Sequence, residues 1–362
     1  MTYRQFLIYL NAIGIRNDEI EKIETYIEDY SIDYEEIFKD SVLDDLRNKF
    51  TPKLIQKLKR KDKKALINLN TYCEKNKIEV ITASDLTYPE RLKNIENYPR
   101  VLYLKGKLDI LDSVSISVVG ARKHTSYGES VLNYFVDELS KLNVTIVSGM
   151  AYGVDGLAHR RSLENKNKTI AVLGNGVDKI YPMKNAKLYS DIIENGAVLS
   201  EYPVGTEPLP FRFPERNRII SGISLATIVI EAKAKSGSLI TARVAAEQGK
   251  EVFSVPGNID SLYSEGTNML IRDGATPLLS IEDILEVIPE IKKNYVDSRE
   301  EDYKAEMGDE ELKVFKLISE GVADTNLIAN ELNEDISYIS SIITILELKN
   351  IIEVEDGLKI KM

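Results

Sequence analysis

Between residues 114 and 257 the sequence alternates short apolar segments with stretches of helical periodicity, and this alternation limits the folds open to the chain. The apolar segments are rich in Val and Ile, as strands buried on both faces of a sheet are. Such strands, alternating with helices, predict a parallel, doubly wound α/β sheet that binds ligands at the carboxyl ends of its strands. The predicted strands are residues 114–120, 144–149, 169–174, 196–201, 225–232 and 251–257, and the predicted helices lie near 127–142, 154–165, 186–194 and 238–248.

Four of these strands run into glycine-containing turns, which would meet on one rim of the sheet. Glycine lets a ligand approach the backbone closely, and a helix that starts there offers free N–H groups to an anion. We therefore expect a phosphate-binding rim, to which Arg122 and Lys123 add full positive charges. The candidate residues are Gly120, Arg122 and Lys123 after the first strand, Ser148 and Gly149 after the second, Gly174 after the third, and Ser236, Gly237, Ser238 and Thr241 after the strand that ends near Glu231.

Several nucleotide-binding and metal-binding motifs are absent from the sequence. It has no G-x-x-x-x-G-K-[ST] segment, which argues against a P-loop nucleotide hydrolase. Gly174-Asn175-Gly176 is followed by Lys179 where a dinucleotide fingerprint has its third glycine, which argues against an NAD site. Cys73 is the only cysteine, so disulfides and cysteine-rich zinc sites are excluded, and we expect its side chain to be packed. No cofactor or metal is expected.

The two histidines give no clear sign of acid–base chemistry. Asp155 and His159 are four residues apart and could share a helix face as a catalytic or metal pair. A helix-capping aspartate beside a structural histidine fits this spacing better. His124 lies in the basic turn, where it could contact phosphate.

Residues 208–222 concentrate arginine and aromatic side chains. Against one acid, Glu215, the segment carries Phe211, Arg212, Phe213, Arg216 and Arg218. Guanidinium groups present forked donors to phosphate oxygens, and aromatic faces stack on unpaired bases. The alternative is a proline-rich loop that buries both phenylalanines in the core and pairs one arginine with Glu201 or Glu231.

The net charge of −11 is distributed unevenly. Residues 1–113 carry a net charge of zero, residues 114–299 carry −1 and residues 300–362 carry −10. This excludes a protein that coats nucleic acid with its whole surface, but it allows a local basic rim. No apolar run approaches the roughly 18–20 residues of a membrane span. The N-terminal segment also lacks a signal-peptide cleavage region, so we expect a cytoplasmic protein without membrane contact.

The sequence outside the predicted sheet divides into three further parts. Residues 1–70 read as an N-terminal helical domain of the SAM or helix-hairpin kind, with helices broken near Gly14. The sheet domain is expected over 71–290 and a polar linker over 291–307. Residues 308–362 show helical patterns at 312–319, 325–332 and 337–348, followed by two strand-like segments joined by Asp356-Gly357. Three helices and a hairpin predict a winged-helix domain.

Taken together, these segments resemble the DprA (Smf) family of DNA-processing proteins. The matching stretches occur in the family's order and cover roughly residues 84–290. They are GARKHTSYG (120–128), VSGMAYGVDGLAH (147–159), LGNGVDKIYPMKN (173–185), SEYPVGTEPLPFRFPERNRIISGIS (200–224), EAKAKSGSLITARVAAEQGK (231–250) and VPGNIDSLYSEGTNMLIRDGA (255–275).

The resemblance implies an extended Rossmann-like fold without a dinucleotide site. It implies a non-catalytic, homodimeric protein that binds single-stranded DNA in natural transformation, protects it, and helps to load RecA onto DNA shielded by single-strand binding protein. Gly120 and Arg122 would grip phosphates, Phe213 or Phe211 would lie near a base, and Lys184 would be a further contact. The resemblance also implies that Arg216, Asn217 and Arg218 shape a basic pocket, either by touching DNA or by holding the loop through ion pairs.

Two other interpretations are open. The fold also resembles nucleotide phosphoribohydrolases of the lysine-decarboxylase-like group, but their PGGxGT loop reads Ser-Gly-Ser-Leu-Ile-Thr at 236–241, and no acid follows at helical spacing until Glu247. The acidic C-terminal domain could instead bind proteins, because its predicted recognition helix, 337–349, offers only Lys349 as a base against Glu347.

Overall fold

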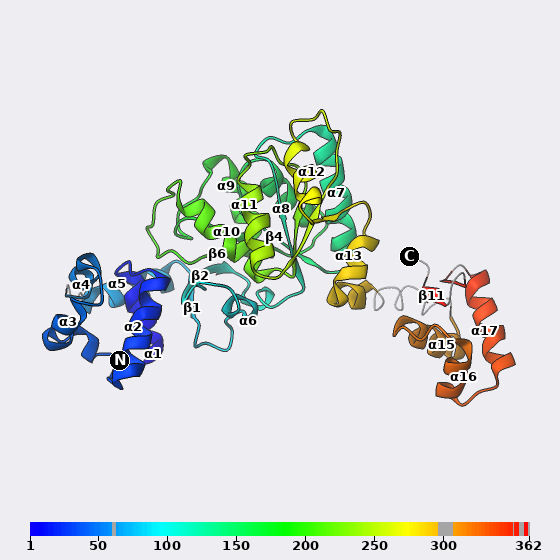
Figure 1. Cartoon of the computed structure of the whole chain (residues 1–362), viewed down its shortest axis with the longest axis horizontal. Helices are drawn as coiled ribbons and strands as arrows, with labels where there is room; N and C mark the ends of the chain where they lie inside the picture. The colour runs from blue at the N-terminus through cyan, green and yellow to red at the C-terminus, as the bar shows by residue number, and fades with distance from the viewer. Residues whose placement is uncertain (60–62, 296–306, 350, 355–357, 361–362) are drawn as a thin grey trace. The chain divides into compact units, whose positions relative to one another are not determined.

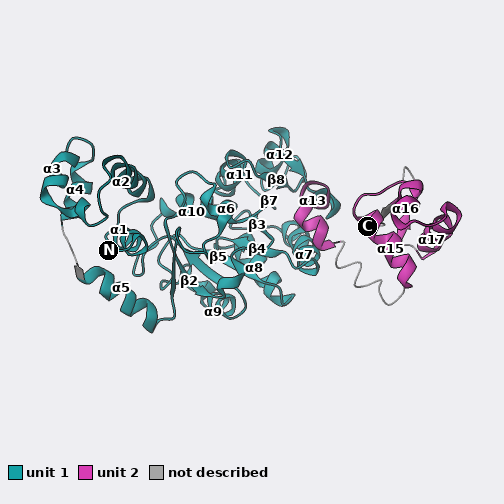
Figure 2. Cartoon of the chain, turned by 90° about the horizontal axis from the view of Figure 1, so that it is seen from below, with its two compact units in different colours: residues 1–283 teal, residues 284–362 magenta. Residues whose placement is uncertain are grey.

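The computed structural model describes residues 1–59, 63–295, 307–349, 351–354 and 358–360. The chain forms two compact units, residues 1–283 and residues 284–362, coloured separately in Figure 2. Within the described residues, no helix combines the length and the apolar character that a bilayer crossing requires.

The first unit begins with helices that pack on one another and on the sheet. The expected break near Gly14 is confirmed, since Gly14 has a φ of +76° between the first two helices. Their apolar faces share a core with sheet residues such as Tyr103, and Asn11 accepts a hydrogen bond of 2.8 Å from the Tyr103 hydroxyl. The helices are α1 (Tyr3–Ala12), α2 (Asn17–Tyr30), η1 (Glu36–Phe38), α3 (Asp40–Leu46), α4 (Pro52–Lys59) and α5 (Lys63–Lys75).

A mostly parallel sheet follows, and its nine strands within the described residues have the order β1-β2-β6-β5-β4-β3-β7-β8-β9. The six strands from β3 to β8 are those expected from the sequence, and each pairs in parallel with its neighbours among them. The sequence did not predict β1 and β2, which form an antiparallel extension beside β6, or the short β9. The strands are β1 (Glu79–Thr82), β2 (Val101–Gly106), β3 (Ser115–Val119), β4 (Thr145–Ser148), β5 (Thr169–Val172), β6 (Ala197–Ser200), β7 (Ala226–Val229), β8 (Glu251–Ser254) and β9 (Thr276–Pro277).

Two layers of helices cover the sheet (Figure 1). On one face α7, α8 and α9 pack in series, and on the other α10 packs against α6 and α11. The sheet is doubly wound because the chain adds β4, β5 and β6 on one side of β3 and β7 and β8 on the other. The helices of this unit are α6 (Glu90–Lys93), η2 (Leu108–Ile110), α7 (Ser126–Lys141), α8 (Val154–Glu164), η3 (Met183–Asn185), α9 (Ala186–Asn195), α10 (Arg212–Ile223), α11 (Ser238–Glu247) and α12 (Glu265–Arg272), and α13 (Glu282–Val287) spans the boundary between the two units.

The arginine-rich segment 208–222 is not a proline-rich loop over most of its length. It forms α10 from Arg212 onward, and Pro214 occupies the first turn of that helix. Proline is tolerated there because the first N–H groups of a helix have no intrahelical acceptor. This correction places Arg216 and Arg218 at fixed positions on a helix.

The second unit contains α15 (Asp309–Ser319), α16 (Thr325–Leu332) and α17 (Ile336–Leu348), close to the predicted helices. The strands β10 (Ile352–Glu353) and β11 (Lys359–Ile360) pair antiparallel. The predicted turn Asp356-Gly357 lies outside the described residues.

The prediction of a linker over 291–307 is wrong at its start. Residues 289–295 are helical, because Pro289 suits a first helical position and Ile291 is fully buried. Residues 296–306 of the predicted linker lie outside the described part of the chain.

His159 on α8 has a structural role, as its spacing suggested. Its Nδ1 atom lies 2.7 Å from the hydroxyl oxygen of Thr169, which itself donates to the Ile146 carbonyl, so Nδ1–H of His159 donates to Thr169. Burial lowers the pKa of His159 to about 3. The imidazole is therefore neutral throughout the physiological range.

This burial predicts an acid-sensitive fold. Unfolded histidine titrates near 6.5, so below that pH the unfolded chain binds a proton that the native state does not, and stability is lost as pH falls toward 3. By pH 4.5 the loss from this residue is about 2–3 kcal/mol. His159→Gln should remove this part of the pH dependence in urea unfolding. Parallel profiles for wild type and His159→Gln would contradict the assignment.

Candidate nucleic-acid interface

A pocket opens where β3, β4 and β5 end, on the rim that the sequence singled out. Its lining comes from the loops after these three strands and from the first turns of α10. The lining residues are Arg122, Gly149, Ala151, Tyr152, Leu173, Gly174, Asn175, Tyr181, Pro182, Phe213 and Arg216.

Arg216 forms the floor of this pocket. Its side chain reaches from α10 under the sheet rim and donates to the carbonyl of Gly149, at 2.9 Å, and to the carbonyl of Val172. Only 4% of the residue is exposed, and this burial lowers the pKa of Arg216 to about 10. A Cβ at position 149 would lie 2.5 Å from the guanidinium. Glycine at position 149 therefore leaves space for the guanidinium in this position. Through its two carbonyl contacts Arg216 joins the ends of β4 and β5.

Asp155 balances the charge of Arg216. Burial raises the pKa of the Asp155 carboxyl group, and the Arg216 charge opposes that rise. Its Oδ2 atom accepts from the N–H of Ala151 at 3.4 Å. Asp155 is the second residue of α8, and Gly153, with φ +77°, is the N-cap. Asp155 thus stabilises the loop before the helix and does not cap the helix as expected.

Aromatic side chains form one wall of the pocket. The rings of Tyr181 and Phe213 stack with centroids 5.3 Å apart and an interplanar angle of 27°. Tyr181 is 43% exposed and Phe211 is 58% exposed, so the alternative that both phenylalanines lie in the core is wrong. Arg212 lies over the rings of Tyr202 and Phe211. Exposed rings beside a cation offer stacking faces to unpaired bases.

Exposed basic side chains border the same region. Arg122 and Lys123 follow β3 and face solvent, and Lys184 is exposed in η3, beyond Pro182 of the pocket wall. A Cβ at Gly120 would lie 2.7 Å from the side chain of Val154. Gly120 therefore serves the packing of the Arg122 turn on α8.

Other candidates lie away from the pocket lining. Arg218 forms a two-pronged ion pair with Glu201, at 2.6 and 3.0 Å, which is the pairing that the sequence offered as an alternative. Asn217 accepts from Nε of Arg216 at 3.3 Å. Ser148 is fully buried and donates to the Val118 carbonyl. Arg218, Asn217 and Ser148 therefore hold neighbouring parts of the fold together and do not line the pocket.

The serine-rich turn after β7 also lies outside the pocket lining. The hydroxyl oxygens of Ser236 and Ser238 are 2.8 Å apart, and Ser238 and Thr241 are buried at the start of α11, whereas Gly237 is exposed.

The start of α7 binds Glu231, which the sequence suggested only as a partner for an arginine. Glu231, two residues after β7, accepts hydrogen bonds from the N–H and the hydroxyl of Thr125, the N-cap of α7, at 2.9 and 2.6 Å. The expected phosphate cradle at this helix start is therefore occupied by a carboxylate of the chain itself.

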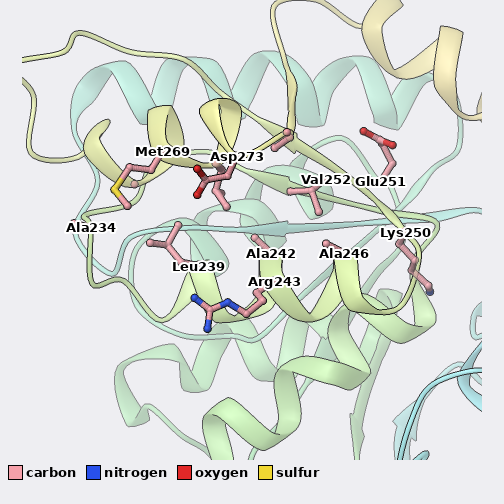
Figure 3. Close-up of a pocket in the computed structure, with 14 residues that line it drawn as sticks. Ala234, Leu239, Ala242, Arg243, Ala246, Lys250, Glu251, Val252, Met269 and Asp273 are labelled. Carbon is pink, nitrogen blue, oxygen red and sulfur yellow. The ribbon is translucent and has the colours of Figure 1, made fainter.

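A second pocket lies between α11 and α12, beside β8 and β9 (Figure 3). Its lining is mostly small and aliphatic, with Arg243, Lys250, Glu251 and Asp273 as charged groups. Among the described residues, no group of three or more His, Cys, Asp or Glu side chains could hold a metal ion.

The Arg218–Glu201 pair predicts a stability effect. Glu201 also accepts from the Asn17 amide at 2.7 Å, and both side chains of the pair are largely buried. Arg218→Ala should therefore reduce the free energy of unfolding by about 2–3 kcal/mol, because it leaves a buried carboxylate unpaired. Arg272→Ala, which removes an exposed pair with Asp273, should cost less than about 1 kcal/mol. Equal losses in denaturant unfolding would show that the Glu201 pair has no special role.

Comparisons with known proteins agree with this architecture. Protein Smf of Escherichia coli K12 is 45% identical over 208 residues, which are 57% of this chain and 56% of that protein. The DNA processing protein DprA of Bacillus subtilis is 43% identical over 221 residues, which are 61% of this chain and 74% of that protein. The match to the first of these therefore spans little more than half of the relative's length.

Two solved structures are similar as well. The X-ray structure of DprA from Streptococcus pneumoniae has a TM-score of 0.69 at 34% identity and covers 79% of this chain and 98% of its own. A structure that concerns the single-stranded DNA binding mode of DNA processing protein A from Helicobacter pylori has a TM-score of 0.53 at 31% identity, covering 59% and 96%. The family model for DNA recombination-mediator protein A matches residues 79–289. This chain therefore belongs to the DNA recombination-mediator protein A family.

Proposed function

We propose that this chain binds single-stranded DNA in the pocket above Arg216 and acts as a non-catalytic mediator of recombination. The observation that carries the proposal is the stacked pair Tyr181–Phe213 beside the exposed cation Arg122 on one rim. An aromatic platform next to a guanidinium suits a ligand that has both unpaired bases and phosphates. The family membership and the single-stranded DNA binding described for the Helicobacter pylori relative support the same conclusion.

In this proposal the residues divide by task. Arg122, Lys123 and Lys184 attract phosphates, while Tyr181, Phe213 and Phe211 stack on bases. Gly149 and Gly174 let the Arg216 and Phe213 side chains take their places, since a Cβ would lie 2.5 Å from the guanidinium at position 149 and 3.0 Å from the Phe213 ring at position 174. Arg216 contributes by holding the ends of β4 and β5 together at the base of the pocket. Sequence selectivity is not expected, because every base has a face that can stack.

The arrangement favours binding over hydrolysis. Asp155, the carboxyl group nearest to the floor, is buried beside Arg216 and accepts a hydrogen bond from the Ala151 N–H. In the turn that replaces the PGGxGT loop of phosphoribohydrolases, Ser238 and Thr241 are buried, and Glu247 is exposed at the end of α11. We therefore infer a non-catalytic role. On the basis of the family membership we further propose that this mediator acts in the cytoplasm and protects incoming DNA during natural transformation.

We also infer three protein partners for this mediator: a second copy of the chain, RecA, and the single-strand binding protein that covers the DNA. The acidic C-terminal residues fit a protein contact better than a DNA contact. On α17 the exposed positions include Ser337, Tyr338, Ile345 and Leu348, which are uncharged, together with Glu347. Lys349 pairs with Glu311 at 2.7 Å. We propose that this winged-helix-like unit contacts proteins.

Removing the rim cation should weaken DNA binding without unfolding the protein. Arg122→Ala should raise the Kd for oligo-dT about tenfold at moderate salt and reduce the salt slope of binding by about one. Its melting temperature should not change, because the side chain is exposed. Lys22→Ala, an exposed cation on α2, is the matched control and should bind like wild type. Wild-type affinity for Arg122→Ala in a fluorescence titration would contradict the assignment.

Removing the stacking face should weaken binding by a different route. Phe213→Ala should cost about 1–3 kcal/mol of binding free energy, since one base loses its stacking partner. The salt slope should stay at its wild-type value, because no charge changes. Phe213→Tyr keeps the ring and should retain most of the affinity. If titrations at several salt concentrations gave Phe213→Ala an unchanged affinity, base stacking at this position would be ruled out.

A further inference from the structure

Glu231 occupies the place in this fold where an open α/β sheet normally receives a ligand. β3 lies between β4 and β7, so the chain reverses its direction of strand addition between β3 and β7. Ligands of doubly wound sheets bind in the crevice at such a switch point, outside the carboxyl ends of the strands. Glu231 follows the end of β7, and the turn that leads into α7 follows the end of β3.

The carboxylate of Glu231 is held as a bound anion would be. Its Oε2 accepts from the N–H of Thr125 at 2.9 Å, and its Oε1 accepts from the Thr125 hydroxyl at 2.6 Å. The same hydroxyl oxygen accepts from the N–H of Gly128 in the first turn of α7. The helix of 16 residues therefore directs its N-terminal dipole at a carboxylate.

The surroundings are shaped to admit this side chain. A Cβ at Gly128 would lie 2.4 Å from the carboxyl group of Glu231, so only glycine leaves space for it. Glu231 is 2% exposed. No Lys or Arg nitrogen of the described residues makes an ion pair with it, so the helix N-terminus and Thr125 are its stabilising partners. The N–H and the hydroxyl of Thr125, which could otherwise bind a phosphate, are already in use.

Glu231 also separates two regions of the rim. The Arg122 turn lies between Ala121, whose N–H donates to the Glu231 carbonyl at 2.7 Å, and Thr125, which binds its carboxylate. Arg122 lines the pocket over β3, β4 and β5, whereas the buried side chain of Glu231 lies at the ends of β3 and β7. A phosphate approaching the crevice at these strand ends would meet the Glu231 carboxylate, which already accepts from the N–H and the hydroxyl of Thr125.

We propose that Glu231 is a specificity-determining residue that excludes free phosphate and mononucleotides from the switch point of the sheet. The inference rests on the proposed function, because it explains why the rim would accept a polynucleotide in the neighbouring pocket but not a small nucleotide in the crevice. Replacing the carboxylate should uncover the anion site that the fold builds at α7.

The test compares anion binding by wild type, Glu231→Gln and Glu231→Ala in the full chain. Each protein is melted with and without inorganic phosphate, which has no base to stack in the neighbouring pocket, at ionic strength matched with sodium chloride. Wild type should show no specific shift. Glu231→Ala should gain about 2–4 °C in melting temperature when phosphate is present well above its Kd, because the ligand binds only the native state. Glu231→Gln keeps the side-chain volume and should gain less. Glu247→Gln, at an exposed position of α11, is the control and should behave as wild type.

Oligo-dT titration of the wild type separates the two claims. If wild type binds oligo-dT while neither variant gains an anion response, the role of Glu231 is refuted and the proposed function stands. If wild type fails to bind oligo-dT, the proposed function itself is refuted. An anion response in wild type would also contradict the proposal. So would loss of folding in both variants, because it would assign Glu231 to support of the fold.

Discussion

The buried guanidinium of Arg216 is the interaction on which the rim depends. It carries a charge into the interior and satisfies the carbonyls of Gly149 and Val172 where β4 and β5 end. A charge buried this deeply is tolerated only with close partners, and Asp155 and these two carbonyls supply them. The floor of the pocket, the glycine at 149 and the position of α10 follow from this one side chain.

Neighbouring contacts hold α10 in place from its other sides. Arg218, two residues after Arg216, is paired with Glu201, which also binds Asn17 of the N-terminal helices. At the far end of the helix, Lys250 donates to the carbonyls of Ser221, Gly222 and Ser224, as cations do at helix C-termini. The N-terminal helices and the sheet thus act together to present Phe213 to solvent. This explains why a helical region without pocket residues packs so closely on the sheet.

Much of this architecture could be predicted from the sequence, because apolar runs and glycine turns report directly on buried strands and their ends. The six central strands and their four helices lie where the periodicity placed them. The roles of the arginines could not be predicted in the same way. Arg216 and Arg218 share one chemistry, and their partners, Asp155 and Glu201, are distant in sequence and close only after folding. Glu231 was considered only as a partner for an arginine, and its contact with Thr125 could not be predicted because the two residues are more than 100 positions apart.

The central claim is that an unpaired base lies against the ring of Phe213, above the Arg216 floor. Photo-crosslinking of the full chain to an oligo-dT that carries one 5-iodouracil, followed by peptide mass spectrometry, tests this claim most directly. The account predicts adducts on Phe213 or on the stacked Tyr181. Adducts confined to residues 1–75 or 308–354, with none on the rim, would contradict it.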